Sequence, residues 1–445
     1  MTMETRLFSP PCGPVQGRRD GEVIRVTGIP YATAARFCPP QAVETWDVPP
    51  SADGWCAACP QPPTLEEFAL LGVPTRILPV DEQCLNLSVT LPADLRADEV
   101  LPVLVWIHGG SYLAGAGDDE FNDPARLVAE QRIIAVSITY RLGVLGYLAG
   151  GERPANLGLL DQLAALRWVR ANIVAFGGDP DEVTLGGQSA GADAVIRVLL
   201  TKEGASSVRR AIIQSAPLGI FSGRDRLNAA LDESIGAIPA DASLDDLLAV
   251  GDAVHEVASP FGLRGQMPFS PRLGAAPLPA ERDVAATWRK TASQVDLLIG
   301  HTRRETSFFV PSLPKVVRMA ALPVIGAALE AAFVAVTSEN LYGRGTRRFA
   351  AAHRRAGGSA LRYLFTWAAP RNSFGSTHAI DLALLFGPSG PPDDTPVLRG
   401  ATREQLETAS RALRSIWGAF IRGEEPPREL ARGILTFRGR PRSPR

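Results

Sequence analysis

The chain has 445 residues, of which 45% are hydrophobic and 21% are charged, and its formal net charge is −1. This composition is typical of a globular protein with enough apolar residues for a large core. Because the net charge is close to zero, charge gives no reason to expect nucleic acid or a membrane as a partner.

The first part of the chain predicts a hairpin followed by irregular structure. Residues 1–13 lack the charged and apolar segments of a secretory signal peptide, so we expect a cytoplasmic location. Residues 15–32 predict two strands joined by a polar turn at 18–21. A region rich in proline, alanine and cysteine follows, up to about Pro79.

All five cysteines lie in the first fifth of the chain, at positions 12, 38, 56, 59 and 84. Cys56 and Cys59 have the spacing of a zinc or redox pair, but no second pair or histidine follows at ligand spacing. We therefore interpret the cysteines as small buried or free thiols and expect no metal.

Short apolar runs predict the strands of a mainly parallel sheet. Residues 101–107 and 133–140 are continuous apolar runs, typical of strands covered on both faces. Five further runs predict strands at 84–91, 183–185, 209–214, 295–299 and 361–367. Because strands alternate with helical segments such as 156–176, the sequence predicts an α/β fold with helices on both faces of the sheet.

Two stretches between predicted core strands have a less regular pattern, at about 218–279 and 311–357. We expect them to be inserted cap segments that shape a pocket, within a single domain that spans 1–445. The longest apolar stretch, 320–337, is interrupted by Pro323 and Glu330. We interpret it as a buried amphipathic helix and not as a membrane span.

The segment Gly187-Gln188-Ser189-Ala190-Gly191 lies between the predicted strand 183–185 and a segment, 190–200, that can be helical. Gly-x-Ser-x-Gly at such a junction is the pattern of a nucleophile elbow, in which a sharp turn exposes a strained serine. The glycines are required because side chains there would collide with neighbouring backbone. The pattern predicts Ser189 as a nucleophile.

A serine hydroxyl needs an imidazole to accept its proton and a carboxylate to orient that imidazole. Of the five histidines, His255 and His353 lie in polar helical contexts that favour the surface. His301 directly follows a predicted strand, and His108 ends another before two glycines, which suits support of an oxyanion loop. His378, in a loop that opens an apolar helix, is the leading candidate for the base.

The acid is expected at the carboxyl end of a core strand, where α/β sheets build their sites. Glu305 lies just beyond the predicted strand 295–299. Asp161, Asp179 and Asp181 precede the serine in the chain. In folds that have a nucleophile elbow, the nucleophile comes first in the chain, then the acid, then the base. This order favours Glu305.

An oxyanion hole needs backbone N–H groups that point at the developing negative charge. One should come from Ala190, the residue after the serine. Others should come from the glycine-rich segment Gly109-Gly110-Ser111, which follows the predicted strand 101–107.

Short motifs occur in order along nearly the whole chain, at 28–32, 82–87, 106–110, 140–143, 156–162, 168–173, 176–180, 187–191, 214–215, 300–305, 375–387 and 417–420. Together they resemble the type-B carboxylesterases, a branch of the α/β-hydrolase fold that includes para-nitrobenzyl esterases and cholinesterases.

The resemblance implies roles for individual residues. Ser189 would be the nucleophile, Glu305 the acid and His378 the base, with oxyanion N–H groups from Gly110, Ser111 and Ala190. Ser215 would lie next to the nucleophile, acid and base without taking part in the reaction. The resemblance also implies two ion pairs and one pair of adjacent, reduced cysteines: Arg36 with Glu82, Arg141 with Asp161, and Cys59 with Cys84.

Four positions depart from the family pattern. Gln188 stands where the family usually has glutamate, which removes a negative charge and favours a neutral substrate over a cationic one. Arg304 and Thr306 replace the usual residues on either side of the acid. Ser111 replaces glycine or alanine but keeps its backbone N–H.

We therefore expect a serine carboxylesterase that hydrolyses a neutral carboxylic ester, a small-molecule substrate, through an acyl-enzyme intermediate and requires no cofactor. One alternative keeps the same residues but makes the protein an acyltransferase, or a hydrolase of amides, carbamates or thioesters. Another is a catalytically silent binding protein with a hydrolase fold. The oligomeric state, monomer or homodimer, stays open.

Overall fold

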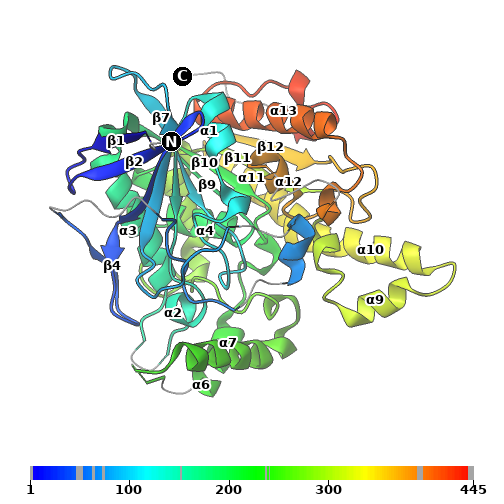
Figure 1. Cartoon of the computed structure of the whole chain (residues 1–445). Helices are drawn as coiled ribbons and strands as arrows, with labels where there is room; N and C mark the ends of the chain where they lie inside the picture. Colours follow the sequence, from blue (N-terminus) through cyan, green and yellow to red (C-terminus); the bar gives the residue numbers. More distant parts are fainter. Residues whose placement is uncertain are drawn as a thin grey trace.

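The computed structural model describes residues 4–46, 54–62, 66–72, 76–150, 153–235, 238–239, 241–387 and 394–438. Within these ranges the centre is a sheet of eleven strands, in the order β1-β2-β3-β6-β8-β7-β9-β10-β11-β12-β13 (Figure 1). The strands are β1 (Thr5–Phe8), β2 (Val15–Asp20), β3 (Val23–Pro30), β6 (Asn86–Pro92), β7 (Leu101–Ile107), β8 (Ile134–Ile138), β9 (Gly178–Gln188), β10 (Arg210–Gln214), β11 (Asp296–Thr302), β12 (Ala360–Phe365) and β13 (Leu435–Arg438). Two short strands, β4 (Ala32–Thr33) and β5 (Gln41–Ala42), pair only with each other.

The strands from β8 to β12 in this order run parallel, and those outside them pair antiparallel. The predicted mostly parallel sheet is therefore confirmed. The predicted strand 101–107 coincides with β7, and the predicted strand 183–185 is the middle of the longer β9. Because the central strands are parallel, their carboxyl ends lie at one edge of the sheet, where the loops after β7, β9 and β11 meet.

β7 shows why a continuous apolar run forms a central strand. Val103, Val105 and Ile107 belong to the hydrophobic core on one face of the sheet. Leu104 and Trp106 belong to the core on the other face. Because successive side chains of a strand point to opposite faces, a strand buried on both sides must be apolar throughout.

Helices cover both faces of the sheet (Figure 1). α3 (Leu157–Asn172), its continuation η3 (Ile173–Phe176) and α4 (Ala190–Leu199) contribute to the first core. α1 (Ala125–Gln131), α12 (Ile380–Leu385) and α13 (Arg403–Ile421) contribute to the second. Shorter elements connect them: η1 (Glu66–Leu71), η2 (Glu120–Asn122), α2 (Gly143–Tyr147), α5 (Lys202–Ser206), η11 (Pro396–Leu398) and η12 (Glu429–Ala431).

Two helical segments interrupt the parallel core. Between β10 and β11 lie η4 (Leu218–Ile220), α6 (Asp225–Ser234), α7 (Leu244–Ala258), η5 (Ser259–Arg264), η6 (Glu281–Asp283), α8 (Val284–Thr291) and η7 (Ala292–Gln294). Between β11 and β12 lie η8 (Glu305–Phe309), α9 (Pro314–Ala320), α10 (Gly326–Ser338), η9 (Glu339–Gly343) and α11 (Arg344–Arg355). Of these last elements, α11 packs against β11 and β12.

The apolar stretch 320–337 is not the buried helix that its sequence predicts. It forms the end of α9, a turn and most of α10, and this helical hairpin projects from the body of the molecule (Figure 1). Val324 is 100% exposed at the turn, whereas Val334 is buried. The prediction is wrong because apolar residues occur all around α10, and only one side of the helix contacts the rest of the chain.

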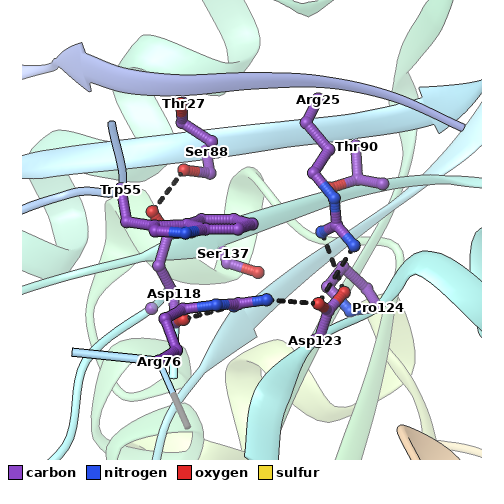
Figure 2. Close-up of a pocket in the computed structure, with 11 residues that line it drawn as sticks. Arg25, Thr27, Trp55, Arg76, Ser88, Thr90, Asp118, Asp123, Pro124 and Ser137 are labelled. Carbon is purple, nitrogen blue, oxygen red and sulfur yellow. Dashed lines mark hydrogen bonds and ion pairs between the residues drawn. The ribbon is translucent and has the colours of Figure 1, made fainter. Parts of the chain in front are cut away.

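Ion pairs fix the segment that follows β7, beside a polar cavity of about 10 Å³ (Figure 2). Arg25 of β3 donates to both carboxylate oxygens of Asp123, at 2.8 and 3.0 Å, and Arg76 donates to the same carboxylate at 2.8 Å. The Arg76 guanidinium also lies 3.5 Å from the ring centre of Trp55. The cavity is large enough for about one water molecule. These contacts hold the chain between the predicted oxyanion loop and α1.

The cysteines behave as the sequence predicts. All five are free thiols, and only Cys38 is exposed. Cys56 accepts a hydrogen bond from the N–H of Gly28 at 3.2 Å, and burial raises the pKa of its thiol. Cys59 lies beside Cys84, and their hydrogen bond together with burial raises the pKa of Cys84. Cys56 and Cys59 therefore contact different residues and do not form a pair.

Candidate active site

Ser189 occupies the sharp turn between β9 and α4. Its φ and ψ angles are 58° and −124°, a conformation that costs a non-glycine residue about 1–3 kcal/mol. A Cβ at Gly187 would lie 2.6 Å from the backbone of Gly191, and one at Gly191 would lie 2.1 Å from the carbonyl oxygen of Ile107. The Ser189 N–H donates to the carbonyl oxygen of Gln214 at 2.9 Å. The two glycines and this bond hold the turn that the sequence pattern predicts.

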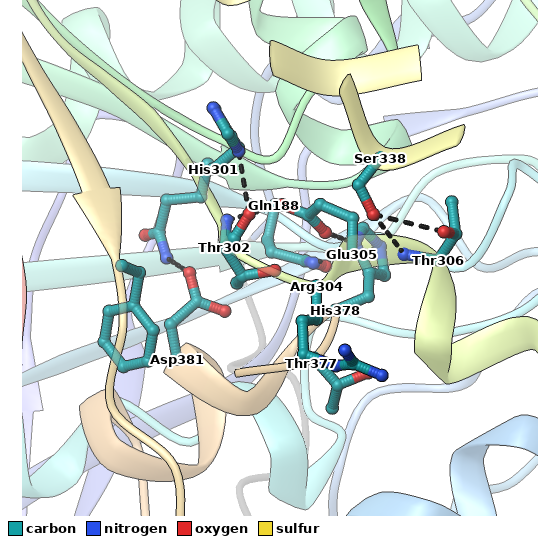
Figure 3. Close-up of polar contacts among 12 residues, drawn as sticks. Gln188, His301, Thr302, Arg304, Glu305, Thr306, Ser338, Thr377, His378 and Asp381 are labelled. Carbon is teal, nitrogen blue, oxygen red and sulfur yellow. Dashed lines mark hydrogen bonds and ion pairs between the residues drawn. The ribbon is translucent and has the colours of Figure 1, made fainter. Parts of the chain in front are cut away.

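Glu305 and His378 meet beside this turn, although 73 positions separate them in the chain. Nδ1 of His378 is hydrogen-bonded to Oε2 of Glu305, and the Thr302 N–H donates to Oε1 at 2.6 Å (Figure 3). Burial acts to raise the pKa of Glu305. The facing imidazole, the charge of His301 and the Ser215 hydroxyl outweigh burial and hold that pKa below its usual value. Glu305 is thus an ionised carboxylate that orients His378.

Ser215 lies directly after β10, in a left-handed conformation with φ of 54°. Its N–H donates to the carbonyl oxygen of Gly300 at 2.9 Å, so it bridges the ends of β10 and β11. Its hydroxyl contributes to the lowered pKa of Glu305, yet its Oγ makes no hydrogen bond of ordinary geometry within the described ranges.

The other imidazole nitrogen faces Gln188. Nε2 of His378 lies 3.2 Å from Nε2 of the Gln188 amide. Because an amide NH₂ only donates, this contact requires the imidazole Nε2 to be without its proton. Nδ1–H then donates to Glu305, which is the tautomer that a general base needs. Gln188, Ser189 and His378 all line one cavity.

The glycine-rich segment after β7 lines the same cavity. Gly110 and Ser111 have φ angles of 104° and 57°. A Cβ at Gly110 would lie 2.0 Å from the carbonyl oxygen of Ala114, and one at Gly109 would lie 2.8 Å from that of Gln188. Nothing in the described part of the chain accepts a hydrogen bond from the N–H groups of Gly110, Ser111 and Ala190. These three donors are available to a ligand.

A buried hydrogen bond connects this loop to the helix after the serine. The hydroxyl of Tyr112 donates to Oδ2 of Asp193 in α4 at 2.7 Å. Nε of Arg197 donates to the same oxygen at 3.3 Å. This pair could not be predicted from the sequence, since 81 positions separate the two residues and no local pattern connects them.

The remaining histidines take other roles. His108 is buried, stacks on Tyr140, and has a pKa that burial lowers to about 4. His353 is buried as well, with Nε2 3.0 Å from the carbonyl oxygen of Val295, so its predicted surface position is wrong. His255, also expected on a solvated face, lines the cavity. His301 is bonded through Nδ1 to the carbonyl oxygen of Thr302 at 2.7 Å.

The unusual residues beside the acid hold its loop in place. Arg304 donates through its backbone N–H to Ser376 at 2.9 Å and through Nε to the carbonyl oxygen of Phe374 at 3.2 Å. The Thr306 hydroxyl lies 3.1 Å from that of Ser338 (Figure 3). The acid loop is therefore attached both to the segment that carries His378 and to α10.

The implied ion pairs are present. Arg36 bonds Glu82 through two nitrogens. Arg141 bonds Asp161 at 2.7 and 2.8 Å, where both side chains are buried.

The cavity that contains these groups has a volume of about 1520 Å³. Its walls are largely apolar and come from the segment after η1, the loop after β7, the η5 region, and η8 to η9, with Leu71, Leu113, Ile220, Met267, Phe308, Phe309, Phe333 and Leu341 among them. Within the described ranges, no group of three or more His, Cys, Asp or Glu side chains is placed to hold a metal ion.

A mostly parallel sheet, a strained serine between strand and helix, and an imidazole–carboxylate pair beyond later strands define an α/β-hydrolase. The chain belongs to the carboxylesterase family, whose family model matches residues 4–321.

Two relatives support this assignment. The chain is 38% identical over 422 residues to a probable N-octanoylanthranilate hydrolase of Rhodococcus erythropolis, which covers 92% of this chain and 91% of that protein. It is 35% identical over 340 residues to the para-nitrobenzyl esterase of Bacillus subtilis, covering 69% of this chain and 65% of that protein.

Solved structures agree. A PNB esterase has a TM-score of 0.79 at 27% identity, covering 97% of both chains. The carboxylesterase of Geobacillus stearothermophilus has a TM-score of 0.72 at 26% identity, covering 95% of this chain and 91% of that one. The chain is a serine carboxylesterase and acts on small-molecule esters.

Proposed function

We propose that Ser189, His378 and Glu305 form the catalytic triad and that Gly110, Ser111 and Ala190 form the oxyanion hole. His378 takes the proton of Ser189 as the hydroxyl attacks the ester carbonyl, and the three N–H groups stabilise the oxyanion. The imidazolium then protonates the departing alcohol, which leaves an acyl-enzyme. Water, activated by His378, releases the acid and restores the serine. Removing one oxyanion donor typically costs about 10²–10³ in rate.

The observation that carries the proposal is the Glu305–His378 hydrogen bond beside a strained serine in the same cavity. Ser189 Oγ makes no direct bond to His378 in the described structure, because the Gln188 amide faces Nε2. Such bonds often tighten only when substrate binds. Attack therefore requires a small rotation of Gln188 or of the serine side chain.

Labelling with a fluorophosphonate probe tests the nucleophile. Labelling of the wild-type chain should disappear in Ser189→Ala and persist in Ser206→Ala, which alters an exposed serine of α5. Persistent labelling of Ser189→Ala would overturn the assignment.

The cavity supports a bulky apolar ester as the substrate. Its volume of about 1520 Å³ exceeds the roughly 300–1,000 Å³ of most small-molecule sites. Gln188 puts an uncharged amide beside the reacting serine, which supports a neutral scissile group. Rates measured with p-nitrophenyl esters of increasing acyl length should rise from the acetyl to the octanoyl ester. The opposite trend would contradict this substrate class.

Amide hydrolysis is a second candidate, supported by the relative from Rhodococcus, whose name specifies an N-octanoyl compound. The same residues can cleave an amide when His378 protonates the leaving nitrogen. Assays that compare N-octanoylanthranilate with phenyl octanoate distinguish the two reactions, since only an amidase turns over the first compound at a comparable rate.

The segments 218–279 and 311–357 are proposed to form caps on a single domain. Their contribution of His255, Met267, Phe333 and Leu341 to the cavity supports this. A cytoplasmic location is also proposed, and cell fractionation tests it. Analytical ultracentrifugation distinguishes a monomer from a homodimer.

A further inference from the structure

The exposed apolar surface of the α9–α10 hairpin continues into the mouth of the active-site cavity. Val316 of α9 and Phe333 of α10 line the cavity, and Val317, next in the chain, is 44% exposed. Ile77 is 91% exposed and Leu263 is 47% exposed, and both also line the cavity. Apolar side chains from three separate segments thus border the opening.

The turn of the hairpin is the most exposed apolar part of the chain described by the structure. Leu322, Val324 and Ile325 are 47%, 100% and 54% exposed. Val324 also has a φ angle of 68°, which a β-branched residue rarely adopts. A large apolar surface on a protein usually marks a contact with another protein or with lipid.

The charges of the hairpin identify the kind of partner. Between Pro314 and Ser338 the only charged residues are Lys315, Arg318 and Glu330. Lys315 and Arg318 are exposed, lie three positions apart on α9 and border the cavity, whereas Glu330 is half-buried. The accessible charge beside the apolar turn is therefore positive, although the net charge of the whole chain is −1.

We propose that the α9–α10 hairpin docks on a lipid surface with anionic headgroups. The turn at 322–325 enters the apolar layer while Lys315 and Arg318 contact the headgroups, as in proteins that lie on one side of a membrane. None of the helices within the described ranges is long and apolar enough to span a bilayer. A second copy of the chain would bring Lys315 and Arg318 of both copies together, so an anionic lipid surface fits better.

Docking there would let an apolar ester pass from lipid to cavity without crossing water. That step rests on the proposed function, whereas docking itself does not. Vesicle binding and hydrolysis of a soluble ester therefore test the two proposals separately.

Co-sedimentation of the full chain with lipid vesicles tests the docking surface. Vesicles of phosphatidylcholine and phosphatidylglycerol should bind the wild-type chain, and pure phosphatidylcholine vesicles should bind it several-fold less tightly. Val324→Asp should weaken binding by about tenfold or more. Val100→Asp is the matched control, because Val100 is 65% exposed and precedes β7 at the edge of the sheet remote from the site. It should bind as the wild type does.

Both variants should hydrolyse p-nitrophenyl acetate at the wild-type rate, since neither residue lines the cavity. Equal vesicle binding by the wild-type chain and Val324→Asp would overturn the proposal, as would no binding by either. Sedimentation velocity provides a second check: a dimer that Val324→Asp converts to a monomer would assign the turn to a second copy of the chain instead. Ser189→Ala should lose hydrolysis of soluble esters but should bind vesicles as the wild-type chain does.

Discussion

Gln188 occupies the variable position of the Gly-x-Ser-x-Gly segment, and its amide nitrogen lies 3.2 Å from Nε2 of His378. An amide donor at this distance favours the neutral imidazole, which is the form that the proposed general base requires. A carboxylate in the same place would favour the charged imidazolium, which cannot act as a base.

Gln188→Glu should therefore shift the acid limb of the kcat/KM pH profile to higher pH, by about one unit, because a negative charge stabilises the protonated base. The measurement is the rate of p-nitrophenyl ester hydrolysis between pH 5 and 9. Gln188→Met, similar in size and uncharged, is the control and should leave the limb close to that of the wild type. An unshifted limb in folded Gln188→Glu would contradict the argument.

The Tyr112 hydroxyl is a second side-chain group whose removal should be measurable. Tyr112→Phe removes the donor to Asp193, whose other carboxylate oxygen already has no partner among the described residues. Arg197 still donates to this carboxylate, so the cost is that of one lost hydrogen bond to a charged group, about 1.5–3 kcal/mol. Urea denaturation should show that loss in the free energy of unfolding. Kinetics should show a lower kcat with little change in KM, because the bond positions the oxyanion loop rather than the substrate.

Tyr147→Phe supplies the comparison, since the Tyr147 hydroxyl instead meets an amide, that of Gln162, at 3.3 Å. It should leave kcat near the wild-type value. Equal effects of the two variants on kcat would show that Tyr112 has no particular role in positioning the loop.

The β9–α4 junction tolerates little substitution. Gly191 lies where a Cβ would meet the carbonyl oxygen of Ile107 at 2.1 Å. The carbonyl group of Ile107 and the Cα of Gly191 both belong to the backbone, so neither can move without displacing β7 or α4.

Gly191→Ala should abolish hydrolysis and lower the melting temperature, because the collision displaces Ser189. Gly251→Ala is the matched control: Gly251 lies inside α7, where a Cβ meets nothing within 4 Å. Alanine there should stabilise the fold by up to about 1 kcal/mol through its higher helix propensity. Thermal unfolding of the two variants in parallel measures both effects, and a stable, active Gly191→Ala would contradict the geometry.

The whole molecule buries several ionisable groups, which makes its stability depend on pH. Burial raises the pKa of Asp381 to about 6, even though Gln214 donates to its carboxylate at 2.7 Å. A carboxyl group whose pKa is higher in the folded state stabilises the fold when protonated, and this stabilisation is lost as the pH rises through the folded pKa.

Asp381→Asn should therefore gain stability relative to the wild type as the pH rises from about 4 to 7. The gain is on the order of 3 kcal/mol, because the neutral amide keeps an acceptor for Gln214 and does not ionise. Chemical denaturation of both proteins at pH 4, 5, 6 and 7 measures it. A difference that stays constant across this range would show that the pKa of Asp381 is the same in the folded and unfolded states.

The sequence by itself determined the central strands of the sheet, the elbow and the order of the catalytic candidates. β7 was predictable because a strand buried on both faces is apolar throughout, and 183–185 of β9 because they form a short β-branched and apolar run. The elbow was predictable because glycines must flank a strained serine. These are local signals that neighbouring residues carry.

Only the tertiary structure decided which distant side chains meet. The contact of Gln188 with His378 and that of Tyr112 with Asp193 depend on the order of strands in the sheet, which no local pattern encodes. The same holds for His353, which is buried against β11, and for the hairpin at 320–337, which is exposed. Burial is set by what packs against a segment, and a segment's own composition does not specify its neighbours.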